Sequence, residues 1–126
     1  MRVIDTSAWI EFLLDSTTGQ RIETAMPDRD ECVVPTIVQF ELAKWLARET
    51  SEDLEQAVLA DTMKCVVAHL DAPIALHAAE LSRNWRLATA DAIVYATALA
   101  HDAELLTCDA HFKDLPGVIY FAKVNP

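Results

Sequence analysis

Four acidic residues lie in segments that otherwise have the pattern of a buried core. They are Asp5, Glu41, Asp91 and Asp109. Asp5 and Asp109 follow short apolar runs, and Asp91 is the only charged residue between positions 87 and 100. Carboxylates that meet in one place repel one another, and a hard divalent cation such as Mg²⁺ or Mn²⁺ compensates that repulsion. A cation held by carboxylates, with water on its open positions, is typical of phosphoryl chemistry.

Each of these acids also has an ordinary structural interpretation. Asp5 and Asp109 could each cap a turn. Asp91 could interact with the dipole at a helix N-terminus. Glu41 could form a solvated ion pair with Lys44, three residues further along a helix. That helix is apolar on most of its circumference, however, so few of its positions can face water.

The elements that would position these acids alternate between short apolar runs and longer helical segments. Apolar and β-branched runs predict five strands, at 3–4, 32–34, 65–70, 104–107 and 118–121. The segments between them predict helices at 7–14, 17–27, 37–49, 51–64, 73–85 and 90–100, with Ser7, Thr17 and Thr36 as N-terminal capping residues. Strands separated by helices pair in parallel through right-handed crossovers. The predicted fold class is therefore α/β, a central parallel sheet of about five strands between two helical layers.

The two acids that follow strands would meet if their strands are neighbours. Asp5 ends the first predicted strand and Asp109 follows the fourth. Doubly wound sheets often place these strands side by side, about 4.8 Å apart. Ligands of such sheets bind beyond the carboxyl ends of the strands. The predicted site therefore lies at that edge of the sheet.

Length and composition limit the classes of protein that this chain can be. Its 126 residues, of which 52% are hydrophobic, fit one domain over 1–126. With only two glycines, Gly19 and Gly117, it has no glycine-rich phosphate loop. The net charge of -10 excludes a broad electrostatic grip on nucleic acid by the whole surface, but it permits a locally basic groove.

Targeting signals and cysteine usage indicate a cytoplasmic protein. An acid within the first five residues is unlike a signal peptide, and no apolar run reaches the roughly 20 residues of a membrane span. The three cysteines, Cys32, Cys65 and Cys108, are odd in number and widely spaced. They are expected to be free thiols in a reducing compartment.

The segments that carry the four acids resemble the PIN domain, and specifically the short VapC-like toxins of toxin–antitoxin pairs. The matching segments are VIDTS at 3–7, FEL at 40–42, DAIVYATA at 91–98 and LLTCDAHF at 105–112. They occur in the order of the family and span nearly the whole chain. Each segment alone is a weak signal, whereas the ordered set of four is a strong one.

The resemblance implies a Mg²⁺- or Mn²⁺-dependent endoribonuclease that cuts single-stranded or loop RNA and leaves a 5′-phosphate and a 3′-hydroxyl. It implies a metal and catalytic site made of Asp5, Glu41, Asp91 and Asp109. It also implies supporting hydroxyl groups from Thr6, Ser7 and Thr107. Such proteins form homodimers, and a cognate antitoxin blocks their acidic groove. Both partners are therefore expected here.

Four basic residues are candidates for RNA phosphate contacts. They are Lys44, Arg48, Arg83 and Arg86. Trp85 lies between the two arginines and could stack on a base, although an amphipathic helix end with solvated arginines and a packed Trp is the favoured interpretation of this segment. The four histidines, at 69, 77, 101 and 111, share no metal-ligand spacing and are expected in surface or packing roles.

Two other classes of protein stay open at this point. One is a phosphoacceptor signalling domain that resembles response-regulator receivers and uses Asp71 with Thr107 and Lys123. Against it, the chain lacks paired acids after its first strand, and helical Glu41 and Asp91 would have no task. The other is a binding module that keeps the acidic groove but does no chemistry.

Overall fold

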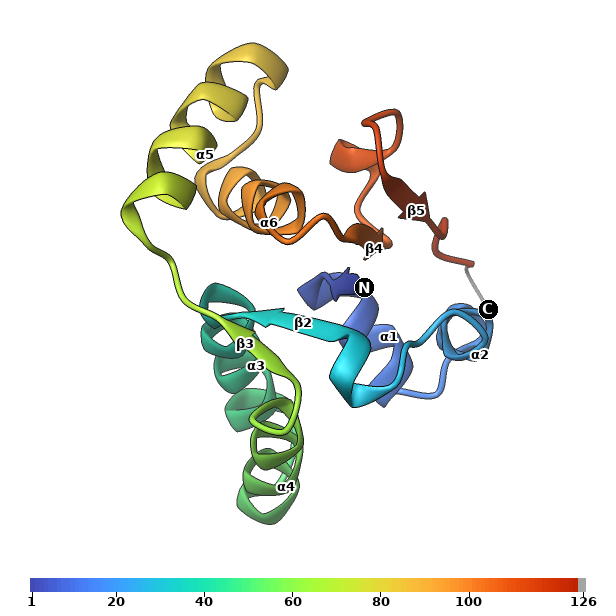
Figure 1. Cartoon of the computed structure of the whole chain (residues 1–126). Helices are drawn as coiled ribbons and strands as arrows, with labels where there is room; N and C mark the ends of the chain where they lie inside the picture. The colour runs from blue at the N-terminus through green and yellow to red at the C-terminus, as the bar shows by residue number, and fades with distance from the viewer. Residues whose placement is uncertain (125–126) are drawn as a thin grey trace.

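The computed structural model describes residues 1–124, and Figure 1 shows its course. Its strands are β1 (Arg2–Ile4), β2 (Cys32–Pro35), β3 (Val66–Ala68), β4 (Glu104–Thr107) and β5 (Val118–Tyr120). They form one sheet in the order β3-β2-β1-β4-β5, and every neighbouring pair is parallel. The predicted α/β fold with a five-stranded parallel sheet is confirmed. The predicted strand at 65–70 is shorter in the structure.

Six helices connect the strands and cover the sheet. They are α1 (Thr6–Leu13), α2 (Thr17–Glu23), α3 (Thr36–Glu49), α4 (Glu52–Thr62), α5 (Ala72–Trp85) and α6 (Thr89–Ala100). There are also two short 3₁₀ helices, η1 (Arg29–Glu31) before β2 and η2 (Ala110–Phe112) between β4 and β5. In Figure 1, α6 and α1 lie on opposite sides of the strands, and α5 packs against α6. The sheet is thus buried between helical layers.

Burial on both faces explains the sequence pattern of the strands. Val3, Ile4, Val33 and Val34 have no exposed surface. A parallel sheet covered on both sides selects continuous apolar runs rather than alternating ones, and such runs marked these strands in the sequence. No helix within residues 1–124 has both the length and the apolar character that a membrane crossing requires.

The helix starts differ from the prediction. Ser7 and Thr36 lie inside the first turns of their helices, because Asp5 and Pro35 occupy the N-cap positions. The N-cap of α2 is Ser16 rather than Thr17. Since α2 already ends at Glu23, the segment up to residue 27 is not helical as predicted. These differences free the Ser7 side chain for another partner.

A tight contact between α1 and α2 positions the segment that follows β5. A Cβ at Gly19 would overlap the backbone carbonyl of Glu11, so only glycine lets the two helices approach this closely. Beside it, the buried Thr18 hydroxyl accepts a hydrogen bond of 2.9 Å from the Val124 N–H. The packing of α2 therefore holds the segment that follows β5.

We predict that Gly19→Ala destabilises the protein by about 2 kcal/mol, because overpacking a rigid backbone contact forces the helices apart. Chemical denaturation monitored by circular dichroism measures this change as a lower midpoint. Gln20→Ala, at the exposed neighbouring position of the same helix, is the control and should leave the midpoint nearly unchanged. Equal midpoints for the two variants would contradict the packing argument.

Candidate metal centre

The strand order brings two of the four acids together. β1 and β4 are neighbours, with Ile4 paired to Leu106, and the Asp5 N–H donates to the Leu106 carbonyl at 2.9 Å. Asp5 is the N-cap of α1, and Asp109 is the N-cap of η2 directly beyond β4. Both side chains therefore start from the carboxyl edge of the sheet, as the sequence predicted for neighbouring first and fourth strands.

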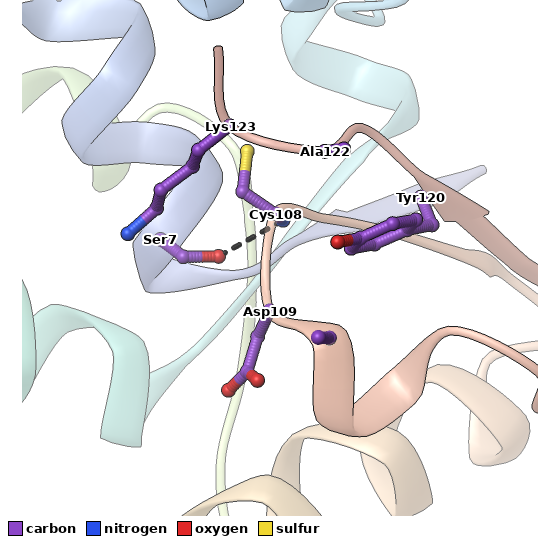
Figure 2. Close-up of a pocket in the computed structure, with 7 residues that line it drawn as sticks. Ser7, Cys108, Asp109, Tyr120, Ala122 and Lys123 are labelled. Carbon is purple, nitrogen blue, oxygen red and sulfur yellow. Dashed lines mark hydrogen bonds between the residues drawn. The ribbon is translucent and has the colours of Figure 1, made fainter. Parts of the chain in front are cut away.

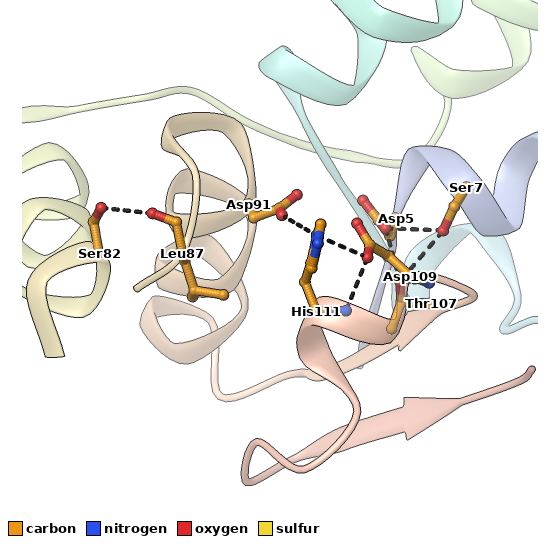
Figure 3. Close-up of polar contacts among 8 residues, drawn as sticks. All are labelled: Asp5, Ser7, Ser82, Leu87, Asp91, Thr107, Asp109 and His111. Atoms are coloured by element: carbon orange, nitrogen blue, oxygen red, sulfur yellow. Dashed lines mark hydrogen bonds and ion pairs between the residues drawn. The ribbon is translucent and has the colours of Figure 1, made fainter. Parts of the chain in front are cut away.

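Two hydroxyl groups hold the Asp5 carboxylate. Only 6% of this residue is exposed. Thr107 Oγ1 donates to Asp5 Oδ2 at 2.7 Å, and Ser7 Oγ donates to the same oxygen at 2.9 Å. Ser7 Oγ in turn accepts the Cys108 N–H at 3.0 Å, which fixes its orientation. Because both hydroxyls contact Oδ2, they orient the carboxylate and leave Oδ1 to other partners (Figure 3).

Asp91 and Asp109 meet around an imidazole. Asp91 lies in the first turn of α6, and His111 lies on η2, two residues after Asp109. His111 Nδ1 is 3.1 Å from Asp109 Oδ1 and 3.4 Å from Asp91 Oδ2. One ligand atom from each residue lies within 4.8 Å of the others, a separation that a single metal ion can bridge. Figure 3 shows His111 between the two carboxylates.

Glu41 reaches the same region from α3. Its Oε1 accepts a hydrogen bond of 2.7 Å from Thr6 Oγ1, and Thr6 directly follows Asp5. Lys44 is not its partner, since the Lys44 ammonium lies over the Phe40 ring, 5.4 Å from the centroid. The solvated ion pair that was the alternative interpretation of Glu41 is therefore wrong.

The charges of these acids act on one another. Burial raises the pKa of Asp5 to about 6, and the negative charge of Asp91 adds to the rise, while the hydroxyls of Thr107 and Ser7 oppose it. Burial also raises the pKa of Asp91, with further contributions from Asp109 and Glu41. Asp91 is thus within electrostatic reach of the other three acids. A nearby cation would relieve this repulsion.

The donor set fits a divalent cation. Two carboxylates and an imidazole converge, and a third carboxylate beside them has been taken out of water. Carboxylate oxygens suit Mg²⁺ and Mn²⁺, and an imidazole nitrogen adds a donor that transition metals accept. The described residues can therefore hold a metal ion here.

His111 is the member of this cluster that sequence reasoning missed. Its expected surface position holds, since 74% of its side chain is exposed, but the imidazole also lies beside two carboxylates, which the sequence did not predict. No spacing between histidines could reveal it, because its partners are acids on other elements. The one local signal is the turn itself, where the His111 N–H donates to Asp109 Oδ1 at 2.9 Å and places the imidazole beside that carboxylate.

The candidate RNA contacts lie on two different elements. Lys44 and Arg48 are exposed on α3, and they line a hollow of about 250 Å³ together with Glu41, Phe40 and Trp45. This hollow adjoins the acidic cluster through Glu41. Arg83 and Arg86, by contrast, are exposed at the far end of α5, which precedes α6. Nothing in the described contacts joins these two arginines to the carboxylates.

Asp71 lies outside the cluster and has a structural partner. It is the N-cap of α5, where its Oδ1 accepts the Ile74 N–H at 3.0 Å. It follows β3, the edge strand, and β2 separates that strand from β1. The receiver-like interpretation, which needs Asp71 beside Thr107, does not fit this arrangement.

Comparison with known proteins agrees with the arrangement of these elements. The family model described as PIN domain matches residues 2–118. The chain belongs to the PIN domain family. Comparison with curated proteins returns no match.

Solved structures with the same fold cover nearly the whole PIN domain. A toxin–antitoxin complex from Klebsiella pneumoniae is similar with a TM-score of 0.82 and 22% identity, covering 94% of this chain and 96% of that one. VapBC2 from Rickettsia felis, bound to a promoter DNA fragment, has a TM-score of 0.72 and 15% identity, covering 94% and 96%. VapC20 from Mycobacterium tuberculosis, a sarcin-ricin loop cleaving toxin, has a TM-score of 0.71 and 20% identity, covering 100% of both chains.

We predict that Asp5→Asn stabilises the metal-free PIN domain. Asp5 has a pKa near 4 when unfolded and about 6 when folded, so the folded state loses stability as pH rises between these values and none beyond. Asparagine does not titrate and can still accept both hydroxyl bonds. In EDTA, the stability advantage of the variant should grow from pH 4 to 6 and then level off at about 3 kcal/mol or less.

Denaturant titrations across this pH range measure the effect. Asp114→Asn is the control, because Asp114 is exposed and lies outside the cluster. A pH-independent difference between Asp5→Asn and the wild type would contradict the argument from desolvation.

Proposed function

We propose that this PIN domain is a metal-dependent endoribonuclease and acts as the toxin of a toxin–antitoxin pair. The observation that carries the proposal is the convergence of Asp91, Asp109 and the buried Asp5 at the carboxyl edge of the sheet. Carboxylates gathered in one place repel one another and need a compensating partner, and no lysine or arginine within residues 1–124 lies in ion-pair distance of these three. A cation that also attracts phosphate meets that need.

Asp5, Asp91 and Asp109 would hold a Mg²⁺ or Mn²⁺ ion, with His111 as a nitrogen donor. Such an ion polarises a phosphate oxygen and lowers the pKa of bound water. Ser7 and Thr107 keep the Asp5 carboxylate in one orientation, so that it need not reorganise when the substrate arrives.

Glu41 is the candidate base for the attacking water. Thr6 Oγ1 occupies one of its carboxylate oxygens, at 2.7 Å, and fixes the plane of the group. The second oxygen is then free to accept a proton from water. Because Glu41 comes from α3 rather than from the sheet edge, it can face the phosphate from another side than Asp91 and Asp109.

Single-stranded RNA suits the surface next to Glu41. The hollow on α3 combines the exposed Phe40 ring and Trp45 with the side chains of Lys44 and Arg48. Aromatic rings stack on unpaired bases, and Lys44 can contact a phosphate, whereas Arg48 already pairs with Glu49 at 2.9 Å. The similar fold of the loop-cleaving toxin from Mycobacterium tuberculosis supports the same class of substrate.

The partners of this protein would be an antitoxin and a second copy of the chain. The similar structure from Klebsiella pneumoniae is a toxin–antitoxin complex, and the one from Rickettsia felis is VapBC2 bound to a fragment of its promoter DNA. An antitoxin that covers the carboxylates would have to bring a basic group, because these acids lack a compensating cation of their own. The homodimer follows from the family resemblance.

We predict that the protein cuts single-stranded RNA with Mg²⁺ or Mn²⁺, and that EDTA stops the reaction. Asp91→Asn should lower the rate at least about a hundredfold, since it removes a metal ligand and one of the charges that hold the ion. Mapping of cleavage sites on total RNA, with the ends of the products identified, measures the activity.

Asp114→Asn is the charge-matched control and should cut at the wild-type rate. Binding of RNA without any cleavage, with either ion, would favour the alternative of a non-catalytic binding module. Cleavage by Asp91→Asn at the wild-type rate would refute the proposed site.

We predict that His111→Ala weakens binding of Mn²⁺ about tenfold and of Mg²⁺ much less. The reason is that an imidazole nitrogen is a better donor for Mn²⁺ than for the harder Mg²⁺. Titration calorimetry on the RNA-free protein measures both affinities without reference to activity. His101→Ala, at the C-terminal end of α6 and away from Asp91 in the first turn, is the control. Unchanged or tighter Mn²⁺ binding by His111→Ala would exclude His111 as a ligand.

A further inference from the structure

A second hollow lies near the end of β5, whereas the hollow described above lies on α3. It has a volume of about 450 Å³ and is lined by Ser7, Cys108, Asp109, Ala110, Tyr120, Ala122 and Lys123. Asp109 is one of the four acids, and Ser7 donates to another of them, Asp5. The hollow therefore opens directly beside these carboxylates (Figure 2). A molecule bound here would touch the groups that surround the reacting phosphate.

The sheet register places an aromatic ring in this hollow. Tyr120 on β5 is paired with Thr107 on β4, and paired residues of parallel strands project from the same face. Thr107 is one of the two residues that hold the Asp5 carboxylate. The Tyr120 ring is therefore one strand away from the acidic cluster, and Figure 2 shows it reaching into the hollow.

A lysine closes the opposite wall. The backbone on either side of Lys123 is held, because the Phe121 N–H donates to the Thr107 carbonyl and the Val124 N–H donates to Thr18 Oγ1, both at 2.9 Å. The side chain itself is exposed and forms no ion pair with any residue in 1–124. Figure 2 shows its ammonium on the side of Ser7. The backbone at Lys123 is thus held in place, and its ammonium, which has no ion-pair partner within residues 1–124, lies next to the carboxylates.

We propose that this hollow binds one nucleotide of a single-stranded RNA, with its base stacked on Tyr120 and its phosphate contacted by Lys123. The proposal rests on the function proposed above and names where the strand goes after it crosses the carboxylates. Base stacking and a phosphate contact are the two interactions that hold an unpaired strand without reading its sequence.

The arrangement on the two sides of the cluster favours a strand over a small ligand. The α3 hollow offers Phe40 with Lys44 next to Glu41, and the β5 hollow offers Tyr120 with Lys123 next to Asp109. Each side therefore pairs an aromatic ring with a cation. A chain with a net charge of -10 can accept a polyanion only where such local cations stand. An RNA strand that spans both hollows lays one phosphate across the carboxylates between them.

The test measures the binding of fluorescein-labelled single-stranded RNA of about ten nucleotides by anisotropy, with Mn²⁺ present. The parent is Asp91→Asn, which does not line the hollow and prevents cleavage during the titration. Tyr120→Leu should weaken binding about tenfold, whereas Tyr120→Phe, which keeps the ring, should stay within about twofold. Lys123→Gln should lower the slope of log Kd against log salt concentration by about 0.7, the value for one phosphate contact on a single strand.

Lys64→Gln is the matched control, because Lys64 follows α4, lies near Asp61 at 3.9 Å and lines neither hollow. It should leave both the affinity and the salt slope unchanged. Wild-type cleavage assays run beside the titration separate the two proposals. RNA that is cut by the wild type but bound equally well by Tyr120→Leu and Lys123→Gln overturns the hollow and leaves the nuclease standing. RNA that the wild type neither binds nor cuts overturns both.

Discussion

The cost of removing the Asp5 carboxylate from water is the constraint on which the rest of this structure depends. Burial raises its pKa to about 6, and the hydroxyl groups of Thr107 and Ser7 offset only part of that rise. Those hydroxyls come from α1 and from the end of β4, so the carboxylate keeps its place only if the two elements meet. This acid therefore destabilises the fold and is held in one position by hydrogen bonds. Titratable groups at functional sites commonly combine these two properties.

The order of the strands follows from the same need. With β1 between β2 and β4, Asp5 stands in the middle of the sheet edge, where acids can approach it from several elements. Asp109 arrives from β4, Asp91 from the first turn of α6 and Glu41 from the second turn of α3. A helix N-terminus tolerates the charge of Asp91 through its dipole. The ordinary interpretation of Asp91 is therefore part of how the site is made rather than an alternative to it.

The sequence predicted the fold well because the fold depends on long-range patterns. Continuous apolar runs identify strands buried on both faces, and helices between them leave parallel pairing as the consistent solution. Local details were less predictable. Ser7 has the composition of an N-cap, but its hydroxyl contacts Asp5 and Cys108 instead. The pairing of Tyr120 with Thr107, like that of His111 with Asp91, depends on the register of distant segments, which no local pattern contains.

The acidity of the chain is compatible with the proposed RNA substrate once its cations are sorted by their partners. Arg2, Arg29 and Lys64 lie beside acids on the outer surface, so their charges are largely neutralised there. Lys44 and Lys123 are different, because each stands in a hollow that adjoins the carboxylates. The surplus of negative charge on the rest of the surface disfavours a polyanion where no such cation stands. Under the proposed function, Lys44 and Lys123 would guide a strand toward the carboxylate cluster between them.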